Sequence, residues 1–243
     1  MPISDFSQIT AVILAGGLGT RLRKVVSDRP KVMIEINGQP FIYYLLDQLA
    51  ESKIERVVIS TGYMAQTIEE TVGSSYRSLH IEYSREEKPL GTGGALKLVV
   101  QAVNTNQCLV MNGDSYTQFD LASMLIFHKE KNAKITLLKK FVDDISRFGV
   151  IELNKQNEIE KFMEKGQNTG SGFINVGVYI MDTSIIQMIP NKTPCSLEFD
   201  FFPGMIGLGL YGFETKGKFI DIGVPESYTR AKKFFCEHLS IQA

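Results

Sequence analysis

The chain has 243 residues, of which 44% are hydrophobic and 22% charged. This supplies enough apolar side chains to offset the entropy of ordering, which excludes a disordered protein. The 26 basic and 27 acidic residues nearly cancel. Binding to nucleic acid regardless of sequence is therefore excluded as well, because such binding depends on excess positive charge and the release of counterions.

The sequence gives no signal for a membrane or for secretion. No apolar run approaches the roughly 20 residues that span a bilayer, and residues 1–5 lack the basic and apolar regions of a signal peptide. The three cysteines, Cys108, Cys195 and Cys236, are far apart and odd in number. That pattern favours thiols in a reducing compartment over a disulfide framework or a zinc site. We therefore expect a cytoplasmic protein.

The first half of the chain alternates strand and helix patterns. Short apolar runs that end in polar or glycine residues predict buried parallel strands. Apolar residues at a spacing of four predict helices, the first of them opened by Pro40. The expected elements are strand 10–15, helix 40–49, strand 55–60, helix 63–72, strand 79–83, helix 92–103 and strand 107–112. This order predicts an α/β fold with a parallel sheet and helices on both faces.

The second half has more strands and fewer helices. The expected elements are strands 134–139, 149–153, 173–181 and 218–222 and a closing helix 225–235. They predict a mixed extension of the sheet that covers one side of a cleft. Because no Pro-, Ser- or Gly-rich linker separates the halves, we expect a single domain, 1–243, with two lobes.

A glycine-rich loop with Gly16, Gly17 and Gly19 follows the first strand directly. Successive backbone N–H groups in such a loop form a concavity that binds anions. The Walker A loop needs a Gly-Lys-Ser/Thr sequence that is absent, and the dinucleotide fingerprint needs glycine where this chain has Leu22. Arg21 can bind two phosphate oxygens, and Lys31 adds a mobile positive charge. The alternative is a tight turn beside two solvated cations.

Two carboxylates follow predicted strands. Asp114 comes after strand 107–112, and Asp221 comes after Phe219 and Ile220. Because ligands of open parallel sheets bind beyond the carboxyl ends of the strands, both side chains are expected to face the same crevice. Two carboxylates and substrate phosphates are typical of a Mg²⁺ site. Each aspartate alone is more simply a turn former or a helix cap.

Several motifs together resemble the sugar-1-phosphate nucleotidyltransferases, the nucleotide-sugar pyrophosphorylases. In chain order these motifs are AVILAGGLGTRLR, PKVM, PLGTGGAL, VMNGDS, FMEK, INVGVY and FIDIGVPESY, and they cover roughly residues 11–235. The stretch from Arg21 to Asp28 looks most like the branch that makes GDP-heptoses. The resemblance implies a Rossmann-like three-layer fold, with a nucleotide-binding lobe at about 8–115 and a sugar-phosphate lobe with a closing helix at 116–243.

The resemblance also implies a reaction and its residues. A nucleoside triphosphate, GTP above all, would react with a sugar 1-phosphate, a manno-heptose 1-phosphate above all, and release pyrophosphate. Arg21, Lys31 and Asp114 would be catalytic, and Asp114 and Asp221 would bind Mg²⁺. The nucleotide site would comprise Leu14, Ala15, Gly16, Gly17, Gly19, Thr20, Glu86, Gly91, Thr92 and Gly93. The sugar-phosphate site would comprise Gly94, Gly149, Glu164, Lys165 and Asn175.

The implied chemistry needs no protein base. A sugar phosphate has a second pKa of about 6 and is itself the nucleophile, in agreement with histidines that lie outside every motif. Guanine presents N–H donors, so Glu86 and Glu87 are candidate acceptors, although backbone carbonyls could serve equally. Lys24-Val25-Val26 and Val32 depart from the residues common in the family, which leaves the base and the sugar open.

Several alternatives remain at this point. Within the class, the chain could act on mannose 1-phosphate with GTP, or on glucose 1-phosphate with a thymidine, cytidine or uridine nucleotide. It could be a non-catalytic regulatory protein that binds nucleotide sugars, although the charged residues at positions 21, 114 and 221 are all present. A retaining glycosyltransferase would need an Asp-x-Asp after a central strand, which the sequence around Asp114 lacks. A homo-oligomer is possible without a firm signal, and the segment 198–202 is expected to pack in the core.

Overall fold

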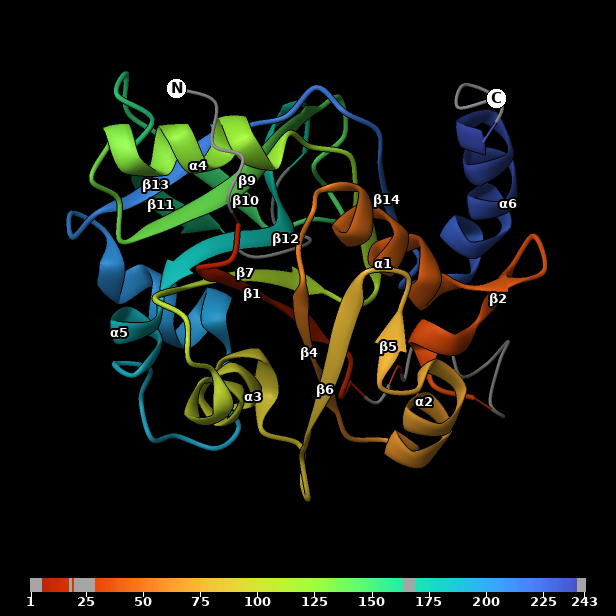
Figure 1. Cartoon of the computed structure of the whole chain (residues 1–243). Coiled ribbons are helices and arrows are strands. Elements are labelled where there is room, and N and C mark those ends of the chain that lie inside the picture. Colours follow the sequence, from red (N-terminus) through yellow and green to blue (C-terminus); the bar gives the residue numbers. More distant parts are fainter. Residues whose placement is uncertain (1–5, 18, 20–28, 164–168, 240–243) are drawn as a thin grey trace.

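One ten-stranded sheet forms the centre of the computed structural model, which describes residues 6–17, 19, 29–163 and 169–239 (Figure 1). Four neighbouring strands run parallel, in the order β7–β1–β4–β6. Their bounds are β1 Ile9–Leu14, β4 Arg56–Thr61, β6 Leu79–Arg85 and β7 Gln107–Asn112. The parallel sheet predicted from the first half of the chain is confirmed.

The sheet becomes antiparallel beyond β7. Strand β12, Gly172–Asp182, pairs with β7 and with β9, Ile135–Val142, and its register shifts between Asn175 and Tyr179. The remaining strands of the sheet are β5 Ser75–Tyr76, β10 Val150–Leu153, β11 Ile159–Met163 and β13 Leu210–Glu214. This is the predicted mixed extension. The same sheet contains strands from both sides of residue 115, so the division into two lobes stays a prediction.

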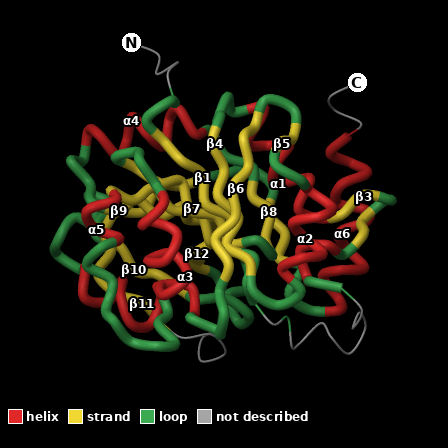
Figure 2. The backbone as a smooth tube through the Cα atoms, turned by 60° about the horizontal axis from the view of Figure 1, so that its bottom comes forward, coloured by secondary structure: helices red, strands yellow, loops and turns green. Residues whose placement is uncertain are grey.

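Side chains alternate between the two faces of β1, as the pleat of a strand requires. Ala11 and Ile13 join one buried cluster and Val12 joins another. Helices cover both faces, and α3 and α4 lie on opposite sides of the sheet (Figures 1 and 2). The helices are α1 Phe41–Glu51, α2 Ala65–Val72, α3 Gly91–Val99, α4 Leu121–Glu130, α5 Thr183–Ile186 and α6 Pro225–Leu239. The arrangement is the three-layer α/β fold that was expected.

Three predicted helix boundaries are corrected. Pro40 is the residue before α1 rather than its first residue, and it pairs in β3, Gln39–Pro40, with β2, Glu35–Ile36. Helix α2 begins at Ala65 rather than at residue 63, because Met64 has a φ of 52°, which is incompatible with a right-handed helix. Helix α3 ends at Val99 and tightens into a 3-10 turn, Val100–Ala102.

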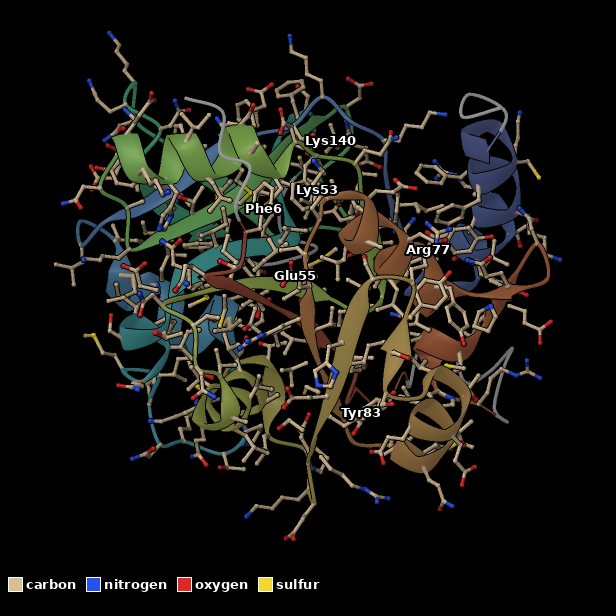
Figure 3. All side chains as sticks on the ribbon, viewed as in Figure 1. Phe6, Lys53, Glu55, Arg77, Tyr83 and Lys140 are labelled. Atoms are coloured by element: carbon tan, nitrogen blue, oxygen red, sulfur yellow. The ribbon has the colours of Figure 1, made fainter. Side chains whose placement is uncertain are left out.

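Some elements were missed by the sequence patterns. Helix α4 begins at Leu121 and is capped by Asp120, whose carboxylate accepts from the Ser123 backbone N–H at 3.1 Å; this cap was visible in the sequence. Tyr83 is on strand β6 (Figure 3). Its hydroxyl donates to the carbonyl of Gly73, the residue after α2, at 2.6 Å and so joins this helix to the sheet. Within the described ranges, no helix combines the length and the apolar character needed to cross a membrane.

Candidate active site

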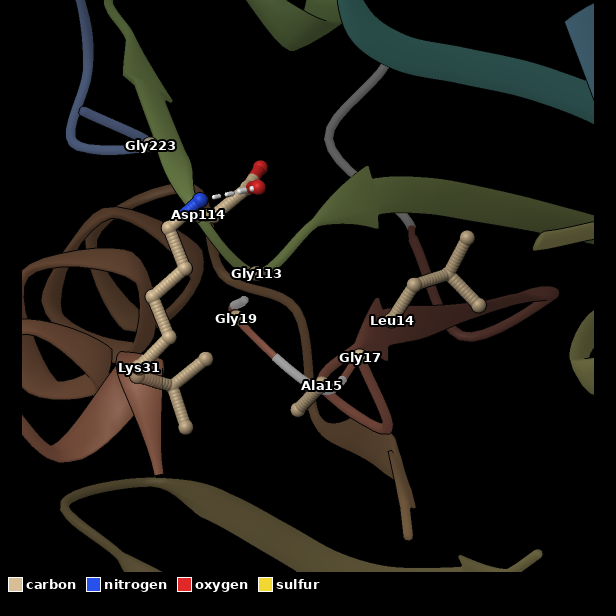
Figure 4. Close-up of a pocket in the computed structure, with 9 residues that line it drawn as sticks. Leu14, Ala15, Gly17, Gly19, Lys31, Gly113, Asp114 and Gly223 are labelled. Atoms are coloured by element: carbon tan, nitrogen blue, oxygen red, sulfur yellow. Dashed lines mark hydrogen bonds and ion pairs between the residues drawn. The ribbon is translucent and has the colours of Figure 1, made fainter. Parts of the chain in front are cut away.

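A cavity lies where β1 ends and the glycine loop begins (Figure 4). Leu14 and Asn112 are paired at the ends of the parallel strands β1 and β7, so the loops after both strands leave at one edge of the sheet. The cavity has a volume of about 150 Å³. Its lining residues are Leu14, Ala15, Gly17, Gly19, Lys31, Val32, Gly113, Asp114 and Gly223.

An ion pair closes one side of this cavity. Lys31 Nζ lies 2.6 Å from Asp114 Oδ2, and the lysine side chain is only 11% exposed (Figure 4). A short 3-10 turn, Lys31–Met33, positions the lysine, because Val32 and Met33 are buried and anchor it. A positive charge is thereby fixed beside the loop that was predicted to bind phosphates.

Asp221 joins the same cluster. The position that a Cβ would occupy on Gly223 lies 2.6 Å from Asp221 Oδ1 and 2.9 Å from Lys31 Nζ. Any larger residue at 223 would displace one of these groups. Three charged side chains from three distant segments therefore meet at one point of the fold.

The route by which Asp221 reaches the cluster differs from the expectation. Its strand β14, Phe219–Asp221, pairs antiparallel with β8, Ser115–Thr117, in a separate two-stranded sheet. The expectation that strand 218–222 belongs to the mixed extension of the large sheet is wrong. The pairing itself brings the carboxylates together, because Asp221 is opposite Ser115 and the Ile222 N–H donates to the Asp114 carbonyl at 2.9 Å.

A second cavity adjoins the first and has a volume of about 430 Å³. Asp114 lines both cavities. The other polar side chains around the second cavity are Thr92, Asn112, Ser115, Asn175, Glu198 and Asp221. Its apolar side chains are Phe148, Phe162, Met163, Val176, Phe199, Pro203 and Phe219. Gly149 also lines it, and its carbonyl accepts from the Asn175 N–H at 3.1 Å.

Glu86 lies beside the glycine loop. Its carboxylate touches the position that a Cβ would take on Gly16, and it accepts from the Leu90 N–H at 2.8 Å. Burial raises the pKa of Glu86, although the bonds from Leu90 and Ser60 act against this shift. Glu87 is exposed. Of the two candidate acceptors for a base, Glu86 is the one that the structure places next to the loop.

The second glycine motif packs against the segment around Cys195. The N–H groups of Gly93 and Gly94 donate to the Cys195 carbonyl at 2.8 and 3.3 Å. Gly91 has a φ of 77°, and a Cβ there would collide with the same carbonyl. Thr92 lines the second cavity rather than the first. The predicted contacts of this motif with a nucleotide or a sugar phosphate stay predictions.

Four of the predicted site residues lie outside the described residues, namely Thr20, Arg21, Glu164 and Lys165. Two residues of the site were missed. Core packing of the segment 198–202 holds for Phe201 and Phe202, which are buried, but Glu198 and Phe199 line the second cavity. The apolar spacing of an α-helix or a strand does not mark these two residues, because the segment Leu197–Phe201 is a π-helical turn.

The acidic side chains of the site determine which metal ion it fits. Asp114 and Asp221 line the second cavity together. Among the described residues, no three or more His, Cys, Asp or Glu side chains lie together so that they could hold a metal ion by themselves. Two carboxylates suit Mg²⁺, which keeps several waters and takes phosphate oxygens as further ligands. His80 and His128 line neither cavity, and His128 is instead buried against Thr136 Oγ1 at 2.8 Å.

A parallel sheet with a glycine loop, a lysine and two carboxylates at the edge of two joined cavities is the frame of a nucleotidyl transferase. The chain belongs to that family, since the nucleotidyl transferase family model matches residues 10–238. Members of the family generally use a divalent metal ion. The resemblance predicted from the motifs is confirmed.

Particular relatives are guanylyltransferases. The chain is 38% identical over 224 residues to D-glycero-alpha-D-manno-heptose 1-phosphate guanylyltransferase of Aneurinibacillus thermoaerophilus, covering 92% of this chain and 96% of that protein. It is 35% identical over 227 residues to mannose-1-phosphate guanylyltransferase of Mycobacterium tuberculosis, covering 92% of this chain but 63% of the relative. The crystal structure of HddC from Yersinia pseudotuberculosis complexed with GMP-PN matches with a TM-score of 0.82 and 35% identity, covering 93% of this chain and 99% of that one.

Proposed function

We propose that this chain transfers a guanylyl group from GTP to a manno-configured heptose 1-phosphate, forming a GDP-heptose and pyrophosphate. The observation that carries the proposal is that Asp114 lines both cavities, a smaller one at the glycine loop and a larger one beyond it. Two cavities that share an acidic residue suit two phosphorylated substrates that must meet. The guanylyltransferases among the relatives support the choice of GTP and of a manno-configured sugar.

The obstacle in this reaction is the repulsion between two polyanions. The phosphate of the sugar is largely dianionic at neutral pH and attacks the α-phosphorus of GTP without a protein base. The bond from the α-phosphorus to the bridging oxygen breaks, and pyrophosphate leaves in line. Lys31 is held at the boundary of the two cavities by Asp114, so its ammonium reduces the repulsion there.

The proposal includes Mg²⁺ held by Asp114 and Asp221. The ion would neutralise charge on the phosphate oxygens as they are brought together. The residues fit this ion because Asp114 and Asp221 line the second cavity together, and two carboxylates leave the remaining positions of Mg²⁺ to phosphate oxygens and waters. Loss of the carboxylate at Asp114 would leave Lys31 nearly buried without its partner at 2.6 Å.

The proposal also covers the base and the location. Glu86 would accept from the N–H groups of guanine, supported by its place beside Gly16. A cytoplasmic location is supported by Cys108 and Cys195, which are buried thiols outside any disulfide.

The test is a matrix of the purified protein with four nucleoside triphosphates and a panel of sugar 1-phosphates, scored by pyrophosphate release. The highest kcat/KM is expected for GTP with the heptose 1-phosphate. A higher value with mannose 1-phosphate would assign the chain to the hexose-specific enzymes. Absence of pyrophosphate release with every pair would overturn the enzymatic function.

A further inference from the structure

A carboxylate that no motif marked lies in the wall of the second cavity. Glu198 belongs to the π-helical turn Leu197–Phe201, which follows Cys195 and the helix cap Ser196. It is partly exposed, and it lines the same cavity as Asn175, Gly149 and Asp114. A carboxylate at this position can only accept hydrogen bonds, so its ligand must present a donor.

Three hydroxyl groups hold this carboxylate in place. Glu198 Oε2 accepts from Ser196 Oγ at 2.8 Å and from Thr92 Oγ1 at 3.1 Å, and Oε1 accepts from the Tyr179 hydroxyl at 3.3 Å. Burial, followed by the charge of Glu198, raises the pKa of Tyr179 well above its usual value, so this hydroxyl keeps its proton and donates. The carboxylate is therefore presented in one orientation before any ligand arrives.

One acceptor position of Glu198 remains for a ligand among the contacts of the described residues. A carboxylate accepts about four hydrogen bonds, and the two on Oε2 are taken while Oε1 has one. The Tyr179 hydroxyl that bonds Oε1 also accepts from Asn175 Nδ2 at 2.9 Å. The open position is thus on the oxygen that is linked to Asn175, a second polar residue of the same cavity.

The charges around the cavity decide which end of a ligand meets Glu198. Lys31 lies beside Asp114, at the boundary with the first cavity, so the phosphate of the sugar belongs at that end. A carboxylate repels a phosphate and accepts from hydroxyl groups. Phe199, next to Glu198, is 57% exposed and offers an apolar surface for the C–H face of a sugar.

We propose that Glu198 is a specificity-determining residue that accepts, through Oε1, a hydrogen bond from one hydroxyl group of the sugar 1-phosphate. The proposal rests on the proposed function, whose acceptor substrate it concerns. The π-helical turn serves this role because it places Glu198 at the cavity while Leu197 and Phe201 of the same turn stay buried.

The test replaces Glu198 by glutamine, which keeps the size of the side chain and removes its charge. A charge-assisted hydrogen bond is worth about 10- to 100-fold in affinity, so the KM for the sugar 1-phosphate is expected to rise by that factor while the KM for GTP stays unchanged. Glu152→Gln is the matched control, because it makes the same substitution at an exposed residue. Glu152 is paired with Lys161 at 3.7 Å and lines neither cavity.

A purely structural role for Glu198 predicts a different pattern. The carboxylate joins Thr92, Ser196 and Tyr179, so loosening this network alone would lower the melting temperature and raise both KM values. The second measurement is a series of sugar 1-phosphates that each lack one hydroxyl group. Wild type and Glu198→Gln should have the same KM for the analogue that lacks the donating hydroxyl. If the KM of the variant exceeds that of the wild type by the same factor for every analogue, the proposal is overturned.

Folding and function are separated in two further ways. If Glu198→Gln does not fold, Glu198→Asp keeps the charge and moves it by one methylene group, and it should fold with a raised KM for the sugar phosphate. Calorimetric titration of the heptose 1-phosphate and of mannose 1-phosphate, with a non-hydrolysable GTP analogue present, needs no turnover. Equal sugar-phosphate affinity in wild type and Glu198→Gln would overturn the role of Glu198, whereas lack of turnover in the wild type would overturn only the proposed function.

Discussion

Lys31 Nζ and Asp114 Oδ2 are 2.6 Å apart although 83 positions separate them in the chain. The pair lies between the glycine loop after β1 and the loop after β7, and Asp221 is within reach of the same point. A lysine with an 11% exposed side chain needs such a partner. In the proposed function, this one contact therefore links phosphate binding and metal binding to the stability of this edge of the sheet.

Replacing Asp114 with asparagine should lower turnover by about 10²–10³-fold, as loss of one preorganised charge at a reaction centre typically does. The variant keeps the shape of the side chain, so the circular dichroism spectrum should not change. The measurement is pyrophosphate release with GTP and the preferred sugar 1-phosphate. Glu152→Gln removes the same charge from an exposed pair with Lys161 at 3.7 Å and should retain full activity. Wild-type turnover in Asp114→Asn would exclude its catalytic role.

Lys31→Met should bind Mn²⁺ more tightly than the wild type in the absence of nucleotide, while its turnover falls. The ammonium group neutralises Asp114 in the unliganded protein and competes with a cation for that carboxylate. Because Asp114 is 41% exposed, the pair is worth roughly 0.5–1.5 kcal/mol, and the expected gain is about 2- to 10-fold in affinity. The affinity for Mn²⁺ is measured by electron paramagnetic resonance, which detects the unbound ion. An unchanged or weaker affinity would show that Lys31 and the metal do not compete.

Two glycine-to-alanine variants should separate the two cavities. Among the described residues, no atom lies within 4 Å of a Cβ placed on Gly17 or on Gly149, so both variants should melt at the wild-type temperature. Gly17 lines the first cavity and Gly149 the second, and a methyl group removes space from each. Gly17→Ala should raise the KM for GTP about tenfold or more, and Gly149→Ala should do the same for the sugar 1-phosphate. If Gly17→Ala instead raised the KM for the sugar 1-phosphate and Gly149→Ala the KM for GTP, the roles assigned to the two cavities would be exchanged.

Glu86→Gln should weaken GTP binding and yet stabilise the fold at neutral pH. Burial raises the pKa of Glu86, so the folded protein holds this proton more tightly than the unfolded chain. The stability contributed by the group is fully present below the unfolded pKa and is lost as the pH rises through the folded pKa.

The difference in melting temperature between Glu86→Gln and the wild type should therefore grow as the pH rises from 4 to neutrality. In the wild type, GTP binding should weaken as the pH falls through the raised pKa of Glu86, because a protonated carboxyl is a poorer acceptor. Calorimetric GTP titrations at several pH values test this. The same pH dependence in wild type and variant would assign the titration to another group.

Local patterns predicted most of the elements that build the sheet. Apolar runs such as 107–112 mark buried strands, and their burial depends little on distant residues. The π-helical turn at Leu197–Phe201 and the pairing of β14 with β8 were not predictable in this way. A strand of three residues has too short a pattern to choose its partner, and it forms only when the rest of the chain presents one.

The sequence by itself indicated the class of protein through motifs such as AVILAGGLGTRLR, PKVM and VMNGDS, whose resemblance to a known family can be seen in short stretches of chain. Only the tertiary structure decided that Asp114 and Asp221 meet through a small antiparallel sheet, and that Glu198 enters the second cavity. The physical reason is that a motif fixes the conformation of its own few residues, whereas a cavity is enclosed by side chains from distant segments whose approach depends on packing of the whole core.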